Sequence, residues 1–496
     1  MGAYTIEDEG DFVVVGTGAG GATAARVLSA AGRSVVLLDE GPRLKTEDRP
    51  RALLGAMTSA FRDFGTTTTR GTSPFPLLQG RLVGGSTAIN SGIIWRLPED
   101  VRREWVERYG LSELADEAGL ARAFDTIERE LEITETSDEV LGNNAALMAL
   151  AAEKLKLPGK VISRNAARCK GTAQCLQGCP GEARQSMDVS YIPRSLAAGA
   201  RLHDQARVDR VLREGGRAVG VEGELVERGS EGRSRGRFKI RAKRGVIVAA
   251  SAVQTPVLLR RSGLRGMVGE RFQAHPGAAV VGRFKDPVGM GFGATQGYEV
   301  PLRDRFMKLE SLSMPPEMLG ARLPGAGPAW QERLGQLDHF AQWCVLVRME
   351  AHGTVRPTLF GTGSDAAVSF TPTALDMRRL REGLTTLCRM MFAAGALEVY
   401  PGIAGLPPVL KDLSEVALVE GYDLKARHLN LMASHLFGSA CAGKDPARSV
   451  VGEDLQAHAL PGLYVMDSSV FPTNLGVNPQ HSIMGVVYRA AERLAA

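Results

Sequence analysis

Three glycines near the start of the chain, Gly16, Gly18 and Gly21, have the spacing of sites that hold a dinucleotide. An apolar segment, residues 12–15, precedes them and predicts a β-strand, and a helix is predicted over residues 19–31. In such a unit the first glycine makes a tight turn, the second lets the backbone approach a pyrophosphate, and the third lets helix and strand pack closely. The free N–H groups at the helix start then face the phosphates.

An acidic residue follows the next predicted strand, at the position where dinucleotide-binding units have a carboxylate that binds the ribose. Residues 34–38 form this apolar strand, and Asp39 follows it directly. A carboxylate at this position accepts a hydrogen bond from a ribose hydroxyl. The order of strand, glycines, helix, strand and acid predicts a dinucleotide-binding βαβ unit, and a glycine turn in another α/β unit is the alternative.

The composition indicates a globular protein with more than one domain. The chain has 496 residues, too many for one hydrophobic core, of which 44% are hydrophobic and 23% charged. The net charge is +5, and much of the basic excess lies within residues 228–244. We expect that run to be a solvated hairpin loop and not a nucleic-acid site, because it is rich in Gly and Ser and lies between strand-like segments.

No segment of the sequence suits a membrane span or an export signal. No apolar run approaches the ~18 residues of a transmembrane helix. The first eleven residues are acidic and lack the apolar core of a signal peptide. We therefore expect a cytoplasmic protein, whose six cysteines are reduced thiols or ligands and not disulfides.

The middle of the sequence changes character, which indicates that one domain is inserted into another. Helical patterns dominate residues 98–157, and strand-like segments follow as a meander, residues 207–212, 218–226 and 238–250. From about residue 270 to 400, Gly and Pro are frequent, and short strand-like runs surround one amphipathic helix, residues 374–394.

The last part of the chain returns to Gly-rich motifs, with a strand predicted over residues 463–467 and a helix over 479–494. The first domain is therefore expected to be discontinuous. We divide the chain into a nucleotide-binding domain, residues 1–270 and 431–496, and a substrate-binding domain, residues 271–430.

Five separated blocks of the sequence, taken together and in this order, resemble those of the glucose–methanol–choline (GMC) oxidoreductases, which use FAD. The blocks are the glycine unit ending in Asp39-Glu40-Gly41, then residues 80–90, 251–264, 435–439 and 467–483. Small departures occur at Arg265, where Gly is usual, after His435, where Pro is usual, and at Ala442, where Met is common. The resemblance implies an α/β, two-domain (α+β) fold, with a Rossmann-like FAD-binding domain and a substrate domain built on an antiparallel sheet.

The same resemblance implies which residues contact FAD. They are Gly16, Gly18, Gly21, Asp39, Gly84, Gly85, Thr87, Asn90, Ser91, Gly92, Val208, Asp467, Asn478 and Pro479. Relatives with covalent flavin often carry a His in the block at 84–90, whereas Thr87, Ala88 and Ile89 stand here, so we expect non-covalent FAD. Pro479 suits the first turn of a helix, whose positive end would face the flavin.

Among the eight histidines, His435 matches the catalytic base of the family, and Asn478 matches its partner. Imidazole titrates in the range that alcohol oxidation needs, because the hydroxyl proton must leave as hydride moves to flavin N5. His481 is either a second polar residue of the substrate pocket or a partly exposed helix histidine. His275 is expected to be structural.

The resemblance implies an alcohol oxidoreductase that forms an aldehyde or ketone. A Met-rich stretch, residues 307–318, and an apolar run, residues 343–349, suggest a hydrophobic alcohol if they line a pocket and not the core. The electron acceptor is O2, a quinone or a redox partner. The alternatives are a redox-neutral lyase that retains FAD, like the hydroxynitrile lyases of the family, and a flavin-binding protein without catalysis.

Three cysteines, Cys169, Cys175 and Cys179, fall in one Gly-containing loop that ends Cys-Pro. Three thiolates are too few for a closed four-cysteine zinc site but suit a 3Fe–4S cluster. The loop also resembles the cluster loop of bacterial FAD-dependent glucose dehydrogenases. One disulfide with a free thiol, or three structural thiols, are the alternatives.

Overall fold

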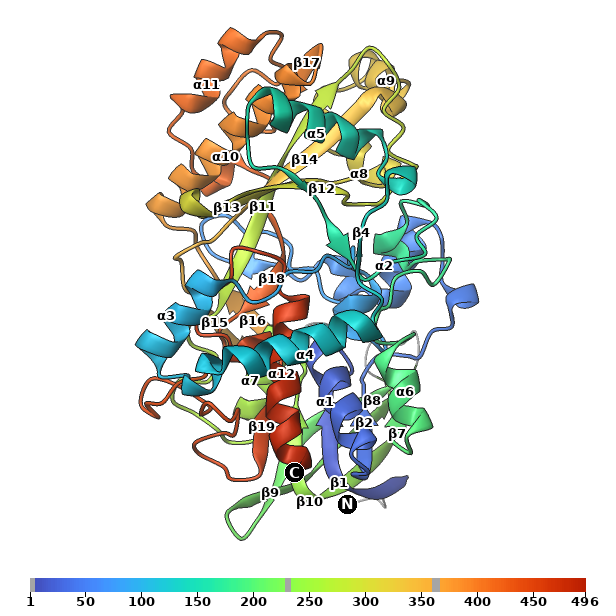
Figure 1. Ribbon diagram of the computed structural model, residues 1–496, viewed down its shortest axis with the longest axis vertical. Coiled ribbons are helices and arrows are strands. Elements are labelled where there is room, and N and C mark those ends of the chain that lie inside the picture. Colours follow the sequence, from blue (N-terminus) through green and yellow to red (C-terminus); the bar gives the residue numbers. More distant parts are fainter. Residues whose placement is uncertain (1–4, 228–232, 359–365) are drawn as a thin grey trace.

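The computed structural model describes residues 5–227, 233–358 and 366–496, and it builds them around two β-sheets that follow each other along the long axis (Figure 1). The first sheet carries both termini at its end of the molecule. Its strands run in the order β7 (Arg201–His203), β2 (Val35–Leu38), β1 (Ile6–Val15), β10 (Ser234–Val248), β9 (Arg217–Val226) and β8 (Ala206–Glu214), with β19 (Leu463–Val465) also paired to β10.

Parallel pairing joins β7, β2, β1, β10 and β19, whereas β8 and β9 form an antiparallel extension beyond β10. The paired ends of β1 and β2 are fully apolar and buried, as expected for a parallel sheet covered on both faces. At the end of β1 the chain turns through Gly16, whose φ is +100°. A Cβ atom at Gly16 would lie 2.2 Å from the Ala249 carbonyl oxygen, so only glycine fits this turn.

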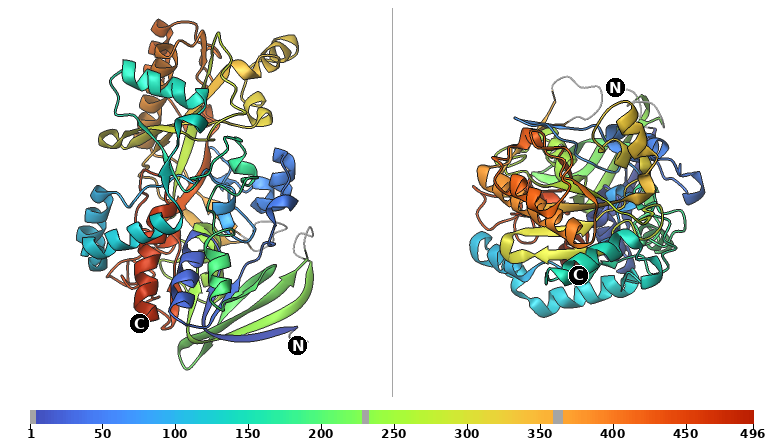
Figure 2. Two further views of the ribbon diagram at one scale, coloured as in Figure 1. Left: turned by 45° about the vertical axis from the view of Figure 1, so that its right-hand side comes forward. Right: turned by 90° about the horizontal axis from the view of Figure 1, so that it is seen from above.

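Helix α1 (Ala19–Ala30) crosses from β1 to β2 and packs between α12 (Gln480–Ala495) and α6 (Tyr191–Ala197), as the left view of Figure 2 shows. A Cβ at Gly21 would lie 2.0 Å from the Gly16 carbonyl oxygen, which explains the close contact of α1 with the strand. Helices α3 (Glu99–Tyr109) and α4 (Glu117–Glu130) lie outside α12, and α7 (Ser251–Arg261) follows β10 directly.

The second sheet is antiparallel and forms the core of the other half of the molecule. Its order is β17 (Glu398–Tyr400), β11 (Gln273–Arg283), β14 (Phe340–Val347), β13 (Met307–Ser311), β12 (Tyr298–Leu302) and β5 (Lys160–Val161), with β18 (Met432–Phe437) also paired to β11. Helices α10 (Ala374–Ala393) and α5 (Asn143–Lys154) pack on it, and α11 (Val416–Glu420) packs on α10. Strand β14 is buried along its whole length, including Trp343.

Short elements complete the described chain. They are α2 (Leu53–Ala60), α8 (Pro316–Gly320), α9 (Pro328–Leu334), a small sheet of β15 (Thr354–Pro357), β16 (Ala366–Ser369) and β3 (Thr69–Arg70), and the pair β4 (Thr134–Glu135) and β6 (Ser163–Arg164). The expected fold class is confirmed: a parallel-dominated, Rossmann-like sheet and an antiparallel substrate-domain sheet. The division of the chain at residues 270 and 430 stays a proposal. Three elements outside residues 271–430, β5, α5 and β18, also belong to the second sheet or pack on it.

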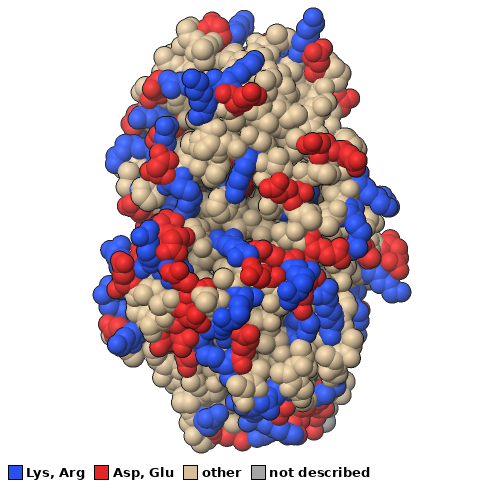
Figure 3. All heavy atoms as spheres, viewed as in Figure 1, with Lys and Arg blue, Asp and Glu red and all other residues tan. Residues whose placement is uncertain are grey.

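The basic run is not the loop that we expected. Strand β10 begins at Ser234, so Arg235, Arg237, Arg241 and Lys243 lie in the sheet, and residues 228–232 lie outside the described residues. Arg241 pairs with Glu214 at 2.7 Å, and Lys243 pairs with Glu9 at 2.9 Å. On the face drawn in Figure 3, acidic and basic side chains are likewise interspersed over most of the surface. The prediction was wrong because side chains alternate between the two faces of a strand. The first part of β10 therefore exposes charged side chains, and only its last part is apolar and buried.

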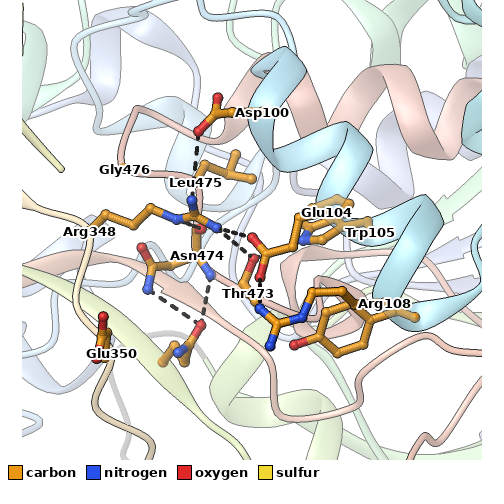
Figure 4. A network of polar contacts seen from close by, with 12 residues as sticks. Asp100, Glu104, Trp105, Arg108, Arg348, Glu350, Thr473, Asn474, Leu475 and Gly476 are labelled. Atoms are coloured by element: carbon orange, nitrogen blue, oxygen red, sulfur yellow. Dashed lines mark hydrogen bonds and ion pairs between the residues drawn. The ribbon is translucent and has the colours of Figure 1, made fainter. Parts of the chain in front are cut away.

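Arg348, just after β14, ties the two halves of the molecule together (Figure 4). Its Nη2 lies 2.5 Å from the Glu104 carboxylate on α3, and its Nε donates to the Asn474 carbonyl oxygen at 3.1 Å. The Asn474 side chain returns a hydrogen bond to the Met349 carbonyl oxygen at 2.6 Å. Both partners in the ion pair are mostly buried, with exposed side-chain fractions of 14% and 20%. The loop that leads into α12 is therefore held by the substrate half of the molecule.

Replacing Arg348 by methionine should lower the free energy of unfolding by about 2–4 kcal/mol, because the substitution leaves the Glu104 carboxylate without this partner in a mostly buried site. Chemical denaturation followed by circular dichroism measures the change. Arg305→Met is the matched control, since Arg305 pairs with Glu382 where both side chains are about half exposed. An equal loss in both variants would contradict the assigned role of Arg348.

Candidate functional site

One large cavity of about 420 Å³ runs from the end of the first sheet to the second sheet. Most of the predicted site residues lie in its wall: Gly16, Gly18, Asp39, Gly85, Thr87, Asn90, Ser91, Gly92, Val208, His435, Asp467, Asn478 and Pro479. Gly21 and Gly84 lie behind the wall, where Gly21 packs on Gly16 and the Gly84 N–H donates to the Thr17 hydroxyl. Segments far apart in the sequence thus meet around a single space.

The half of the cavity beside the first sheet has the features of a dinucleotide cradle. A Cβ atom added to Gly18 would meet nothing within 4 Å, so the backbone here borders open space at the start of α1. A Cβ on Gly85, whose φ is +53°, would approach the Gly18 Cα to 3.0 Å. Two stretches of bare backbone therefore face each other, and the N–H groups at the start of α1 give this place a positive potential.

Asp39 lies at the end of β2, inside the protein. It accepts hydrogen bonds from the Thr17 hydroxyl at 2.5 Å and from the N–H of Gly41 at 2.8 Å. Burial raises the pKa of Asp39 to about 6, although these hydrogen bonds act in the opposite direction. Glu40, the next residue, also borders the cavity and forms an ion pair with Arg62. Asp39, which we predict to bind the ribose, therefore borders the cavity and is held by hydrogen bonds within the chain.

Asp467 follows β19 and joins its own segment to the start of α7. Its carboxylate accepts from the Ser251 N–H at 3.0 Å, the Thr255 hydroxyl at 2.6 Å and the Ser469 N–H at 2.8 Å. Helix α12 begins close by, and Asn478, Pro479 and Gln480 border the cavity at its N-terminal end. Gln480 accepts a hydrogen bond of 2.6 Å from the Asn90 amide, which joins the 84–92 loop to the helix start.

His435 projects from an irregular part of β18. The register with β11 shifts between Ala274 and Pro276, so Ser434 and His435 together oppose His275. A bulge of this kind turns a side chain out of the alternation of the strand. His435 Nε2 lies 3.5 Å from the Asn478 amide nitrogen, so the structure brings the predicted base and its partner together in the cavity wall.

Lys308, on β13, determines which way the Asn478 amide points. Its Nζ lies 2.5 Å from Asn478 Oδ1, and because an ammonium group only donates, that atom must be the amide oxygen. The amide nitrogen then faces His435 and donates to Nε2. The base therefore presents its lone pair on Nε2, the ring nitrogen on the side of Asn478.

Two carboxylates stabilise Lys308, which is fully buried. Glu299 lies 2.5 Å and Glu310 lies 2.7 Å from its Nζ. Burial opposes the charge, but these two partners outweigh it and raise the pKa of Lys308, so the ammonium group persists. Burial lowers the pKa of His435 to about 3, and the Lys308 charge contributes. His435 is consequently neutral at neutral pH, as a base must be before it accepts a proton.

His481 does not have the pocket role that we considered, nor is it a partly exposed histidine. It is fully buried, its Nε2 lies 2.9 Å from Glu128 on α4, and its ring packs on Phe124. His275 is also buried, with its Nε2 2.7 Å from Asn474 Oδ1, and it supports the loop before α12. Helical periodicity explains the result for His481. Gln480 and Ile483 border the cavity from one face of α12, and His481 lies about 100° around the helix from Gln480, on the packed side.

The three cysteines lie beside the 84–92 loop and outside the cavity wall, although Leu176 of their own loop borders the cavity. Cys169 and Cys175 are 3.8 and 3.1 Å from the two terminal nitrogens of Arg164. Burial raises the pKa of the Cys175 thiol, but Arg164 and Arg184 outweigh it and lower the pKa overall. Arg184 also donates to the Ala88 carbonyl oxygen, so it links the two loops.

The space between the three thiols is small, about 10 Å³, which is room for about one water molecule. Within the described residues, no three Cys, His, Asp or Glu side chains are arranged to hold a metal ion. All six cysteines are free. The loop as folded does not fit a 3Fe–4S cluster, and we assign no step to one.

Several functional residues were missed from the sequence. Lys308 and Glu310 lie on β13, within the Met-rich stretch 307–318 that we interpreted as core or pocket. Glu299 on β12 and Arg322 after α8 lie outside that stretch. A signal was present for two of them, since Lys308 and Glu310 are opposite charges on the same face of an otherwise apolar strand. The Met-rich stretch itself divides: Met307 is core, whereas Met314 and Met318 line the cavity.

The fold and the site define a FAD-dependent oxidoreductase class, and comparisons with known proteins show the family. The GMC oxidoreductase models match residues 11–277 and 361–486, so the chain belongs to the GMC oxidoreductases. An uncharacterized GMC-type oxidoreductase of Mycobacterium tuberculosis is 35% identical over 98% of this chain and 76% of its own. A long-chain-alcohol oxidase of Arabidopsis thaliana is 24% identical over 98% of this chain and 68% of its own.

Solved structures share the fold at low identity. Pyridoxine 4-oxidase from Mesorbium loti superposes with a TM-score of 0.72 at 18% identity, over 97% of this chain and 98% of its own. A formate oxidase of Aspergillus oryzae superposes with a TM-score of 0.74 at 17% identity, over 98% of each chain. The family implies FAD, and the cradle described above fits it. No described helix is long and apolar enough to cross a membrane, and the expected cytoplasmic location stays a prediction.

Replacing Lys308 by methionine should raise the pKa of His435, because it removes a positive charge that disfavours the imidazolium form. NMR titration of the histidine ring nitrogens measures the shift, with His435→Gln identifying the signal. Lys160→Met is the control, since Lys160 also pairs with Glu299, at 3.4 Å, but is half exposed. A His435 pKa that is unchanged in Lys308→Met, or that rises equally in both lysine variants, would contradict the electrostatic role of Lys308.

Proposed function

We propose that this protein oxidises an alcohol to an aldehyde or ketone, with His435 as the base. FAD, when bound, supplies the acceptor for the hydride that leaves the alcohol carbon. The observation that carries the proposal is the neutral His435 beside Asn478, in the cavity wall between the dinucleotide cradle and the second sheet. The residues that would hold FAD are those of the cradle, with Asp39 at the ribose and the start of α12 at the flavin.

The chain's own groups manage the proton. The alcohol hydroxyl takes the place of the Asn478 amide at His435 Nε2, a contact of 3.5 Å, and gives its proton to that nitrogen as the two electrons of the C–H bond leave with the hydride. Asn478 is held by Lys308, so its amide nitrogen is available to hydrogen-bond the substrate oxygen beside Nε2. Asn478 is buried and His435 is partly buried, and a substrate that fills the cavity would exclude water from the pair, which strengthens these interactions.

The apolar lining of the cavity beside the second sheet favours a hydrophobic alcohol as substrate. Leu312, Met314, Met318, Leu346 and Met432 give the second-sheet half of the cavity an apolar wall. Methionine side chains adapt to irregular apolar substrates. The long-chain-alcohol oxidase relatives act on substrates of that kind. We propose O2, a quinone or a redox protein as the electron acceptor.

A redox-neutral lyase that retains FAD is the alternative. The same pair, His435 and Asn478, would then move a proton without hydride transfer. Anaerobic mixing with a panel of alcohols separates the two functions. An oxidoreductase loses its flavin absorbance when it meets its alcohol, whereas a lyase keeps it.

Replacing His435 by glutamine should slow flavin reduction by about 10²–10⁴-fold, the usual contribution of a general base. Anaerobic stopped-flow absorbance measures the rate, and the bound FAD per chain is determined in the same samples. His481→Gln serves as the control, because His481 is outside the cavity wall, and its rate should stay near that of the wild type. A His435 variant that retains the wild-type rate would place the base elsewhere.

FAD should be released completely by acid precipitation, because the 84–90 block has Thr87 and no histidine to form a covalent link. The Thr87 hydroxyl is already used, donating to the Gly84 carbonyl oxygen at 2.6 Å. All yellow colour is therefore expected in the supernatant, and its absorbance spectrum measures the amount. Colour that remains in the denatured pellet would show a covalent bond.

A further inference from the structure

Two charged residues border the part of the cavity that the second half of the molecule provides, Glu310 and Arg322. Glu310 is satisfied within the chain. One of its oxygens pairs with Lys308 at 2.7 Å, and the other accepts from the Gln296 amide at 2.6 Å. The Arg322 guanidinium, in contrast, forms no hydrogen bond or ion pair with any residue in the described part of the chain.

Arg322 lies beyond the reactive pair, further from the dinucleotide cradle. Lys308, which contacts Asn478, is opposite Leu346 in the β13–β14 register, and Glu310 is opposite Cys344. The step from Leu346 to Cys344 is two residues along β14, about 7 Å at strand spacing. The Arg322 guanidinium is close enough to Cys344 to lower the pKa of that thiol, against the larger effect of burial. The order away from the cradle is therefore His435 with Asn478, then Lys308, which lies behind the cavity wall, then Arg322.

An unpaired guanidinium in this place is costly for the protein. Arg322 is partly buried, and desolvation lowers its pKa. Such a charge is normally matched by a carboxylate of the same chain, because removing an ion from water without a partner is unfavourable. Among the described residues no carboxylate pairs with this guanidinium, which borders the cavity, so an anion bound in the cavity would stabilise it.

We propose that Arg322 binds a carboxylate at the far end of the substrate, which makes the substrate a hydroxy acid. Its hydroxyl carbon would lie at His435 and Asn478, and its carboxylate at Arg322. Leu312, Met314 and Met318 would contact an apolar chain between these two ends. The proposal rests on the proposed alcohol oxidation and specifies the class of alcohol.

A carboxylate fits the site better than a phosphate. The planar guanidinium matches the two oxygens of a carboxylate in a bidentate pair. Arg322 is the single described cation in this part of the wall whose charge is not already matched, so it balances one negative charge. A doubly charged phosphate would need a second cation.

The experiment compares a straight-chain primary alcohol with the ω-hydroxycarboxylate of the same chain length. In Arg322→Gln, the ratio of kcat/KM for the hydroxy acid to kcat/KM for the neutral alcohol should fall about 10–100-fold, the usual weight of hydrogen bonds to a charged group. The change should be in KM, because Arg322 is remote from the reacting atoms. Arg378→Gln is the control, since Arg378 is exposed on α10 and outside the cavity, and the ratio should not change.

A binding measurement separates this inference from the proposed function. Calorimetry with a straight-chain monocarboxylate requires no turnover, and binding should be lost in Arg322→Gln and partly restored in Arg322→Lys. That result supports the carboxylate site even if no alcohol reduces the flavin. Alcohol oxidation with an unchanged ratio, and carboxylate binding that is absent or independent of Arg322, would overturn the inference and leave the proposed function standing. Tighter Arg322-dependent binding of an alkyl phosphate would overturn the choice of a carboxylate.

Discussion

The site depends on one buried ammonium group. Lys308 belongs to the second sheet, yet its hydrogen bond fixes Asn478 at the start of α12 in the first half of the molecule. Because an ammonium group only donates, the Asn478 amide has one orientation, and the lone pair of His435 is assigned with it. Glu299 and Glu310 make this possible, since a lone ammonium at zero exposure would lose its proton. A chain of fixed groups therefore runs from two carboxylates to the base.

The same arrangement couples the two halves of the protein. His435 is carried by β18, which pairs with β11 of the second sheet, whereas Asn478 precedes α12, which packs on α1. Arg348 reinforces this junction by holding residues 473 and 474 against α3. The reactive pair thus straddles a boundary between two sheets, and contacts far from the cavity determine whether it is assembled.

Much of the fold and part of the candidate site could be predicted from local sequence. The turn at Gly16, the strand before it and Asp39 after the next strand are specified by neighbours in the chain, so pattern alone locates them. Lys308 could not be found in this way, because its partners lie 9, 2 and 170 residues away and only the β12–β13 pairing and the domain junction bring them together. His481 shows the opposite case, where a residue close to the site in sequence faces away from it. The prediction of a loop for the basic run was wrong for a similar reason, since its salt bridges to Glu9 and Glu214 depend on strand pairing.

Charge in the cavity is distributed according to what each part must do. Beside His435 the charges are balanced within the chain, because Lys308 holds the Asn478 amide and is itself paired with two carboxylates. The low pKa of His435 therefore results first from burial and second from the charge of Lys308. Further along the wall, Arg322 has no such compensation. A charge that is matched internally organises the protein, whereas one left unmatched in a cavity must be matched by what enters it. On this physical ground the two cations have different roles. Lys308, buried behind the cavity wall, positions the reactive pair, whereas Arg322, in the wall, is the residue that we propose selects the molecule that reacts.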